Sequence, residues 1–410
     1  MRKLAQILVI LELTRIASAT TPVTVEQLSR IVASIDGKQD AEAARQLSDL
    51  SLTEQLSSKN LLYLKNKLAG EKAKQALVVL ADASVFLHPP LADVLTLAPP
   101  TQSEQAKMVS LIYEYLEKTN PKLPNFFASR LTVRYKEIVG QLDFGEQATD
   151  GAADVQRMKV VGANRTTNTY RNGHESEDSA ATGKDQNSEE NGLVTKGTFG
   201  SILNVVFFDA MNANSSLTWV RWEQGTAGLL ATFQYRVPED ASHYDIGWCC
   251  TPNGNQLSLF RKRTAYHGEL DIDPANGAIQ RLTIEADLDP TLPVARSDIM
   301  VEYGAVELGG RTYVCPIKSV SISRGRSIQT FNNQNPATSF KTLGPYVTLL
   351  NDVAFDQYHL FRSDVRILTG PTQPLKKNSS ALTPFDGHRT ASCVCGFQSW
   401  EKLGLKSKQT

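Results

Sequence analysis

The sequence has 410 residues, which is room for two domains of about 100–200 residues each or for one large domain with extensions. It carries 43 basic and 43 acidic side chains, so its formal net charge is zero, and this balance excludes a globally basic nucleic-acid-binding protein and a polyanionic solvating chain. With 41% hydrophobic and 21% charged residues, the composition is that of a globular protein with a sizeable core.

The N-terminus has the features of an export signal. Residues 1–3 are short and basic, an apolar run follows over 4–11, and the small residues 17–19 fit a cleavage site. Because Glu12 interrupts the apolar stretch, the alternative is an amphipathic first helix. We expect residues 1–19 to be a signal peptide and the chain to be exported, to the periplasm or the extracellular space. The apolar run is far shorter than the about 20 residues that span a bilayer, so no transmembrane segment is expected.

Residues 20–120 are predicted to form a small helical domain. Thr24 and Gln27 have the spacing of a capping box, which is typical of a helix N-terminus. Apolar side chains then recur at three- and four-residue intervals in five short segments, of which the last, around Met108 and Ile112, is the clearest. Such segments with short turns predict an antiparallel bundle. The bundle either docks a protein partner or packs against and caps the domain that follows.

Residues 121–370 favour β-branched and aromatic residues in period-two alternation, which predicts many strands. Asn172-Gly173 is a strong hairpin signal, and residues 175–191 are predicted to form an acidic loop. One helix, over 198–211, is expected to cover the sheet. Since helices do not alternate with the strands, we predict an antiparallel sheet instead of a parallel α/β sheet. Residues 371–410 are expected to be a flexible tail.

One predicted strand indicates how its two faces differ. Over residues 279–288, Leu282 and Ile284 lie on one side, and Arg281, Thr283 and Glu285 lie on the other. The pattern predicts one apolar face and one solvated face. A second sheet, a covering helix or a ligand must bury the apolar face.

The cysteines suggest a disulfide but leave the pairing open. Cys249 and Cys250 end one strand-like run and Cys315 lies within another, so one of the pair can bridge to Cys315 in an oxidising compartment. The alternative is that Cys315 is a small buried apolar residue.

Three tryptophans cluster in the β region and line either the core or a ligand cavity: Trp219, Trp222 and Trp248.

Catalytic and metal-binding motifs are missing from the sequence. It contains no nucleophile elbow, zinc-protease motif or P-loop, and the Cys and His spacing does not support a metal site. We therefore expect no cofactor and no metal. His267 and His359 lie in strand-like runs beside tyrosines and can serve as an acid and a base if they share one cavity; otherwise they are ordinary sheet histidines.

Two resemblances to known proteins add to this interpretation. Residues 266–277 with 281–283 resemble a hairpin of the lipoprotein-carrier half-barrel superfamily, in which helices cover the concave apolar side of a strongly curved antiparallel sheet. Over longer segments, including 81–87, 122–130, 266–288 and 351–359, the chain resembles a set of exported bacterial proteins with no established function. Neither resemblance implies catalytic residues, and half-barrel carriers lack an N-terminal helical domain.

We therefore predict an α+β fold, with a small N-terminal helical bundle followed by a large curved antiparallel half-barrel and one covering helix. The predicted function is non-catalytic binding of an apolar or lipid moiety, such as an acyl chain, or of an envelope protein partner. The alternatives are a ligand-free envelope scaffold and a hydrolase without a recognisable motif. The ligand-cavity candidates are the three tryptophans with His267 and His359; no nucleic-acid partner is expected.

Overall fold

The computed structural model describes residues 20–35, 37–137, 158–178, 198–213, 217–225, 228–253, 256–331 and 340–361. The segment expected to be a signal peptide, most of the acidic loop and the C-terminal tail lie outside these residues. In the part of the chain described, no helix is both long and apolar enough to cross a membrane.

The N-terminal part is a four-helix domain with a short parallel strand pair. Thr24 caps the first helix as predicted: its hydroxyl accepts from the Gln27 N–H at 3.2 Å, and the Gln27 side chain accepts from the Thr24 N–H at 2.8 Å. A shared apolar core that includes Leu28, Leu47 and Leu77 holds the helices together. The elements are β1 (Thr21–Val23), α1 (Val25–Ser34), α2 (Asp40–Ser48), β2 (Leu50–Leu52), α3 (Ser58–Lys67) and α4 (Glu71–Ala83).

The fifth predicted helix, α5 (Gln102–Glu114), belongs to the core of the β region instead of the helical bundle. Its Met108 and Ile112 pack in the main core of the sheet, and it continues into η1 (Tyr115–Thr119) and η2 (Asn120–Lys122). The turn at Gly277, which has a φ of 74°, lies so close to α5 that a Cβ there would stand 2.2 Å from the Leu111 carbonyl carbon. The expectation of a five-helix bundle was therefore wrong, because this amphipathic stripe is buried against strands.

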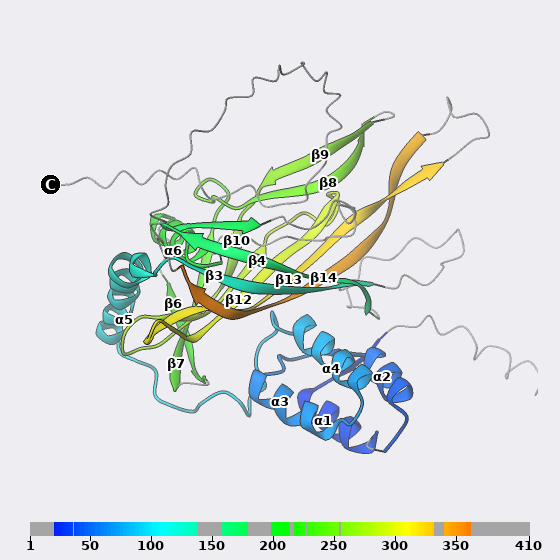
Figure 1. The fold of residues 1–410 in the computed structure, drawn as a ribbon, viewed down its shortest axis with the longest axis horizontal. Coiled ribbons are helices and arrows are strands. Elements are labelled where there is room, and N and C mark those ends of the chain that lie inside the picture. Colours follow the sequence, from blue (N-terminus) through cyan, green and yellow to red (C-terminus); the bar gives the residue numbers. More distant parts are fainter. Residues whose placement is uncertain are drawn as a thin grey trace, which may run out of the picture.

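The β region is built on an open, ten-stranded antiparallel sheet, as the sequence predicted (Figure 1). Its strands, from one edge to the other, are β5 (His174–Asp178), β4 (Met158–Arg171), β3 (Phe126–Glu137), β14 (Phe340–Leu360), β13 (Arg311–Phe331), β12 (Val294–Leu308), β11 (Ile279–Ala286), β10 (Tyr266–Ile272), β7 (Leu229–Val237) and β6 (Thr218–Gln224). Asn172 and Gly173, both with positive φ, form the predicted hairpin turn. The first residues of the expected acidic loop, up to Asp178, belong to strand β5.

The apolar face of the sheet is covered by the protein's own elements. Helix α6 (Ser201–Asn212), the expected covering helix, buries Val206 and Phe207 against it, and α5 adds Ile112. A separate hairpin of β8 (Asp245–Asn253) and β9 (Gln256–Arg263) adds Tyr244 and Trp248 from its first strand and the turn before it. The resulting core includes Phe233, Leu270, Leu282, Ile284 and Val301, each at most 1% exposed.

The helical domain packs on the opposite face of the sheet. Figure 1 shows α1–α4 beside the strands, away from α6 and the β8–β9 hairpin. At the end of α4, Val85 packs with Tyr135, Met300, Val320 and Leu350, which come from strands β3, β12, β13 and β14. The chain then passes round the sheet edge to α5, where the Trp222 indole N–H donates to the Ala98 carbonyl at 2.9 Å. This connector covers the edge strand β6.

Candidate functional site

A cavity of about 710 Å³ lies between the segment after α4 and the polar face of strands β7, β10 and β11. The segment 85–88 forms one wall, and residues of the three strands, with Thr218 of β6, form the other. The cavity arises because this face carries charged side chains over β6, β7, β10 and β11, so the helical domain cannot pack against it as closely as against the apolar strands. The polar lining residues are His88, Thr218, Gln234, Arg236, His267, Glu269, Arg281, Thr283 and Glu285.

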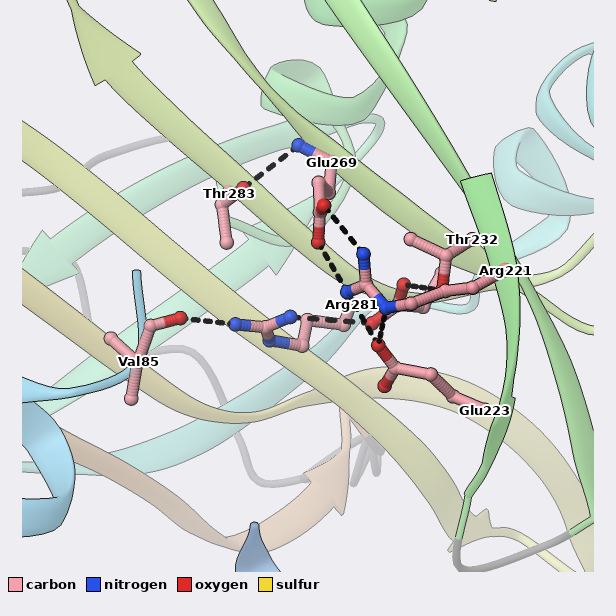
Figure 2. A network of polar contacts seen from close by, with 8 residues as sticks. Val85, Arg221, Glu223, Thr232, Glu269, Arg281 and Thr283 are labelled. Atoms are coloured by element: carbon pink, nitrogen blue, oxygen red, sulfur yellow. Dashed lines mark hydrogen bonds and ion pairs between the residues drawn. The ribbon is translucent and has the colours of Figure 1, made fainter. Parts of the chain in front are cut away.

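A network of paired charges organises one end of this cavity (Figure 2). Arg221 forms a bidentate pair with Glu269, at 2.8 and 2.6 Å, and donates to Glu223 at 2.6 Å. Arg281 donates to the Val85 carbonyl, which ties the helical domain to the sheet, and stands 3.4 Å from Asp271. Figure 2 shows these side chains converging from β6, β10 and β11. Bidentate arginine–carboxylate pairs fix orientation as well as charge, so this end of the cavity is rigid.

Burial and pairing set the charge states in the network. Burial raises the pKa of Asp271, and the neighbouring Glu223 adds to the effect. Burial also opposes ionisation of Glu269, but its hydrogen bonds with Arg221, together with the attraction of Arg221, Arg281 and His88, outweigh burial and lower its pKa. Carboxylate oxygens of Glu223, Glu269 and Asp271 lie within 4.8 Å of one another, close enough to hold a cation. The Arg221 guanidinium contacts two of the three and already supplies the positive charge there.

The other end of the cavity holds a histidine–carboxylate pair. His267 Nδ1 lies 2.8 Å from Asp287 Oδ1, and Arg236 donates to the same carboxylate at 2.9 Å. Such a pair orients an imidazole for acid–base work, but a hydrolase also needs a nucleophile within hydrogen-bond reach of the imidazole. Within the described residues, no serine, threonine or cysteine is hydrogen-bonded to His267.

Glu285, opposite His267 on the neighbouring strand, is the acidic group of the cavity that lacks a partner. No hydrogen bond or ion pair joins it to another described residue. Burial, with a contribution from Asp298, raises its pKa to about 7. Its carboxylate is therefore available to a group that enters the cavity.

A second space, an apolar groove of about 470 Å³, lies beside the first, between α2, α4 and the strands β3, β4 and β12. Phe86 and Leu87 line both spaces, so the cavity and the groove meet at this segment. The apolar lining of the groove includes Leu47, Leu50, Leu52, Ala76, Val79, Leu80, Ala83, Tyr135, Met158 and Val160. Lys72, Gln75 and Arg296 also line the groove. The interface between the two domains is thus polar on one side of Phe86 and mostly apolar on the other.

The tryptophans chosen from the sequence line neither space. Trp219 and Trp222 contact each other on β6 with ring centroids 6.0 Å apart, and both pack against the core of the apolar face. Trp248 is 8% exposed, and Gly325 leaves the room for its ring. The structure therefore places all three in or against the core.

The two histidines chosen from the sequence do not share a cavity. His267 lies in the interdomain cavity, whereas His359 contacts Phe127, with the rings tilted and their centroids 5.2 Å apart, and lines a separate depression with residues such as Glu307 and Phe361. The hypothesis that they act together as an acid and a base was wrong, because they lie on β10 and β14 with three strands between them.

The expected bridge to Cys315 is not formed. Cys315 is a free, fully buried thiol that packs with Phe126, Phe199 and Val353. Cys250, which takes part in a disulfide, packs instead with Leu257 and Leu259 in the β8–β9 hairpin. Cys315 and Cys250 belong to different apolar clusters, so their sulfurs do not pair and the prediction of a bridge between them was wrong.

Only some of the residues that line the cavity could be predicted from the sequence. The alternation over 279–288 placed Thr283 and Glu285 on one face with Arg281, but nothing in the sequence indicated that residues 85–88 cover that face.

No protein-family model, curated protein or solved structure matches this chain.

Proposed function

We propose that the chain is an exported, non-catalytic binding protein that holds the apolar chain of an amphiphile in the groove between its helical domain and its sheet. The observation that carries this proposal is the apolar groove of about 470 Å³ at the domain interface. Ligand sites of this size and apolar lining occur preferentially between domains. The absence of catalytic motifs from the sequence is consistent with a binding role.

The apolar face of the sheet, where half-barrel carriers would suggest a ligand, is a poor site in this chain. Side chains of α5, α6 and the β8 region are buried against that face, and Val206 and Tyr244 are completely buried there. A ligand would have to displace them and lose their packing. The groove on the opposite side requires no such displacement, so the proposed site is there.

The ligand class follows from the way the groove and the cavity meet. Phe86 and Leu87 border both, so one molecule can extend from an apolar lining into a polar one. An alkyl or acyl chain with a polar head group matches this division. Each buried methylene contributes about 0.8 kcal/mol, so chain length determines affinity until the groove is full.

Neutral long-chain alcohols test the proposal without involving head-group charge. The full chain would be loaded with an uncharged, polarity-sensitive fluorescent dye, which is then displaced by alcohols of 8 to 16 carbons at concentrations that exclude micelles. We expect the Kd to fall roughly tenfold for every two carbons added, since two methylenes amount to about 1.6 kcal/mol. No displacement by any alcohol would overturn the proposal.

A pair of variants on α4 locates the site. Val79 lines the groove, whereas Val78, on the same helix, does not. Val79→Phe fills part of the groove and is expected to weaken alcohol binding at least tenfold, and Val78→Phe is the control of equal size. Equal effects of the two variants would place binding elsewhere. Thermal melting checks that both variants fold.

A further inference from the structure

Glu285 stands out among the charged residues that line the interdomain cavity because, within the part of the chain that the structure describes, it has no partner. It lies on β11, directly across from His267 on β10, and is partly buried. The basic groups nearby are engaged elsewhere: Arg236 and His267 share Asp287. The cavity therefore presents one uncompensated carboxylate.

The remaining charges of the lining leave that carboxylate uncompensated. Glu269 is held by Arg221 in a bidentate pair, and Arg281 is held by Asp271 and by the Val85 carbonyl. His88 also lines the cavity, on the segment opposite the strands, and it is exposed. Arg281 keeps one buried donor, its Nε, without a hydrogen-bond partner, but its guanidinium is paired with Asp271. An anionic ligand would therefore meet Glu285 and Glu269 without an unpaired guanidinium to receive it, whereas a cationic ligand would meet an unpaired carboxylate.

The electrostatics of Glu285 agree with this geometry. Burial is the main cause of its raised pKa, Asp298 and Glu269 add to the shift, and Arg296 and Arg281 do not compensate. A positive group in contact with the carboxylate would supply the missing attraction and favour its ionised form. Phe86, at the junction with the groove, already has the Arg296 guanidinium over its ring, 5.5 Å from the centroid, so an alkylammonium ion would have to use the rest of the ring or replace Arg296 there.

We propose that Glu285 binds a cationic head group, of the alkylammonium type, whose apolar chain extends past Phe86 into the groove. This inference rests on the proposed function and specifies its ligand class. In this proposal the ligand runs past Phe86 and Leu87, which border both spaces, from the polar lining of β10 and β11 to the apolar lining of α4 and β3. The head group is held by one carboxylate, and the chain is held by apolar contact.

Three ligands with the same 14-carbon chain test the proposal: tetradecyltrimethylammonium, tetradecanol and tetradecanoate. Each displaces the uncharged dye at pH 8.5, where Glu285 is ionised, below its micelle concentration. We expect the ammonium ligand to bind at least tenfold more tightly than the alcohol and the carboxylate ligand to bind more weakly than the alcohol. Glu285→Gln should bring the ammonium Kd to within about twofold of the alcohol Kd. Glu307→Gln, which removes an exposed charge from β12, is the control.

The outcomes separate this inference from the proposed function. If all three ligands bind with equal affinity, or the carboxylate binds most tightly, the cationic head group is wrong while the apolar groove stands. If the ammonium preference persists in Glu285→Gln, the assignment to Glu285 is wrong. If none of the three displaces the dye, the proposed function itself fails. The wild-type comparison of the three ligands does not depend on the folding of any variant.

Discussion

Asp82 of the helical domain forms a buried ion pair with Lys318 of the sheet, across 236 residues of sequence. Asp82 lies near the end of α4 and is completely buried, and its second carboxylate oxygen has no hydrogen-bond partner. Lys318 Nζ also stands 3.9 Å from Asp352 on β14, so one lysine serves two carboxylates. This cluster joins the two domains next to the apolar groove.

The first prediction concerns the pH dependence of this contact. Burial raises the pKa of Asp82 from its ordinary value of 3.8 to about 7, against the attraction of Lys318, and Asp352 adds to the shift. Because the folded form binds a proton that the unfolded form releases, the contribution of Asp82 to stability is full below pH 4 and is lost as the pH rises towards 7. We expect the stability of the wild type relative to Asp82→Asn to decrease by a few kcal/mol over this range.

Urea denaturation of both proteins between pH 4 and 8 measures this difference. The comparison with Asp82→Asn is needed because Glu285, whose pKa is also raised, contributes a slope of the same sign to both proteins. A wild type that gains stability over the variant as the pH rises would show that the attraction of Lys318 outweighs burial, and the prediction would be wrong.

The second prediction concerns removal of the lysine. Lys318→Met leaves Asp82 and Asp352 without their shared cation in a buried setting, and such a change typically costs about 3–5 kcal/mol. Combining Lys318→Met with Asp82→Asn removes the more buried of the two uncompensated carboxylates and leaves Asp352, so we expect the double variant to recover part of the loss. Denaturation of the two single variants and the double variant measures the coupling. Additive effects would indicate that the two residues do not interact energetically.

The local pattern of the strands was predictable from the sequence, whereas the partners of their faces were not. Alternation over 279–288 correctly placed Leu282 and Ile284 in the core, and both are completely buried. The opposite face was expected to be solvated, yet Arg281 is 8% exposed and Thr283 is 3% exposed. The reason is that the helical domain covers this face through contacts such as Arg281 with Val85, which are 196 residues apart. Periodicity reports the polarity of a face but not the element that covers it.

The difference between local pattern and long-range packing also explains why the sequence predicted only part of the candidate site. Tryptophan and histidine were chosen because of their chemistry, but their neighbours depend on long-range packing, and only His267 lines the cavity. Glu285 was visible in the sequence as one of several charged residues on a strand face. Its importance comes from the pairing of the charges around it, which requires the contacts of β6, β7 and β10.

The third prediction concerns Gly268, at the point where β10 lies close to the Tyr235 side chain of the neighbouring strand β7. A Cβ at this position would stand 1.9 Å from the Thr283 carbonyl oxygen and 2.8 Å from the Tyr235 hydroxyl, which donates to that same oxygen at 2.5 Å. Gly268→Ala must therefore separate β10 from β11 beside the cavity, and we expect a loss of about 3 kcal/mol, at the upper end of typical overpacking costs. Gly162→Ala on β4 is the control, since its Cβ would meet only the flexible end of Arg134, at 3.2 Å. Urea denaturation of the two variants gives the comparison, and equal losses would contradict the packing argument.

The fourth prediction concerns the thiol of Cys315. It is completely buried among aromatic side chains, and burial raises its pKa to about 12, so the reactive thiolate is scarce at neutral pH. We expect iodoacetamide to leave Cys315 unmodified in the native protein and to modify it fully in urea without any reductant. Peptide mass mapping of the two samples distinguishes this cysteine from the other four. If the Cys315 peptide in urea became alkylated only after reduction, Cys315 would be disulfide-bonded and its assignment as a free core thiol would be wrong. Modification in the native state would instead show that the aromatic cluster around it opens readily.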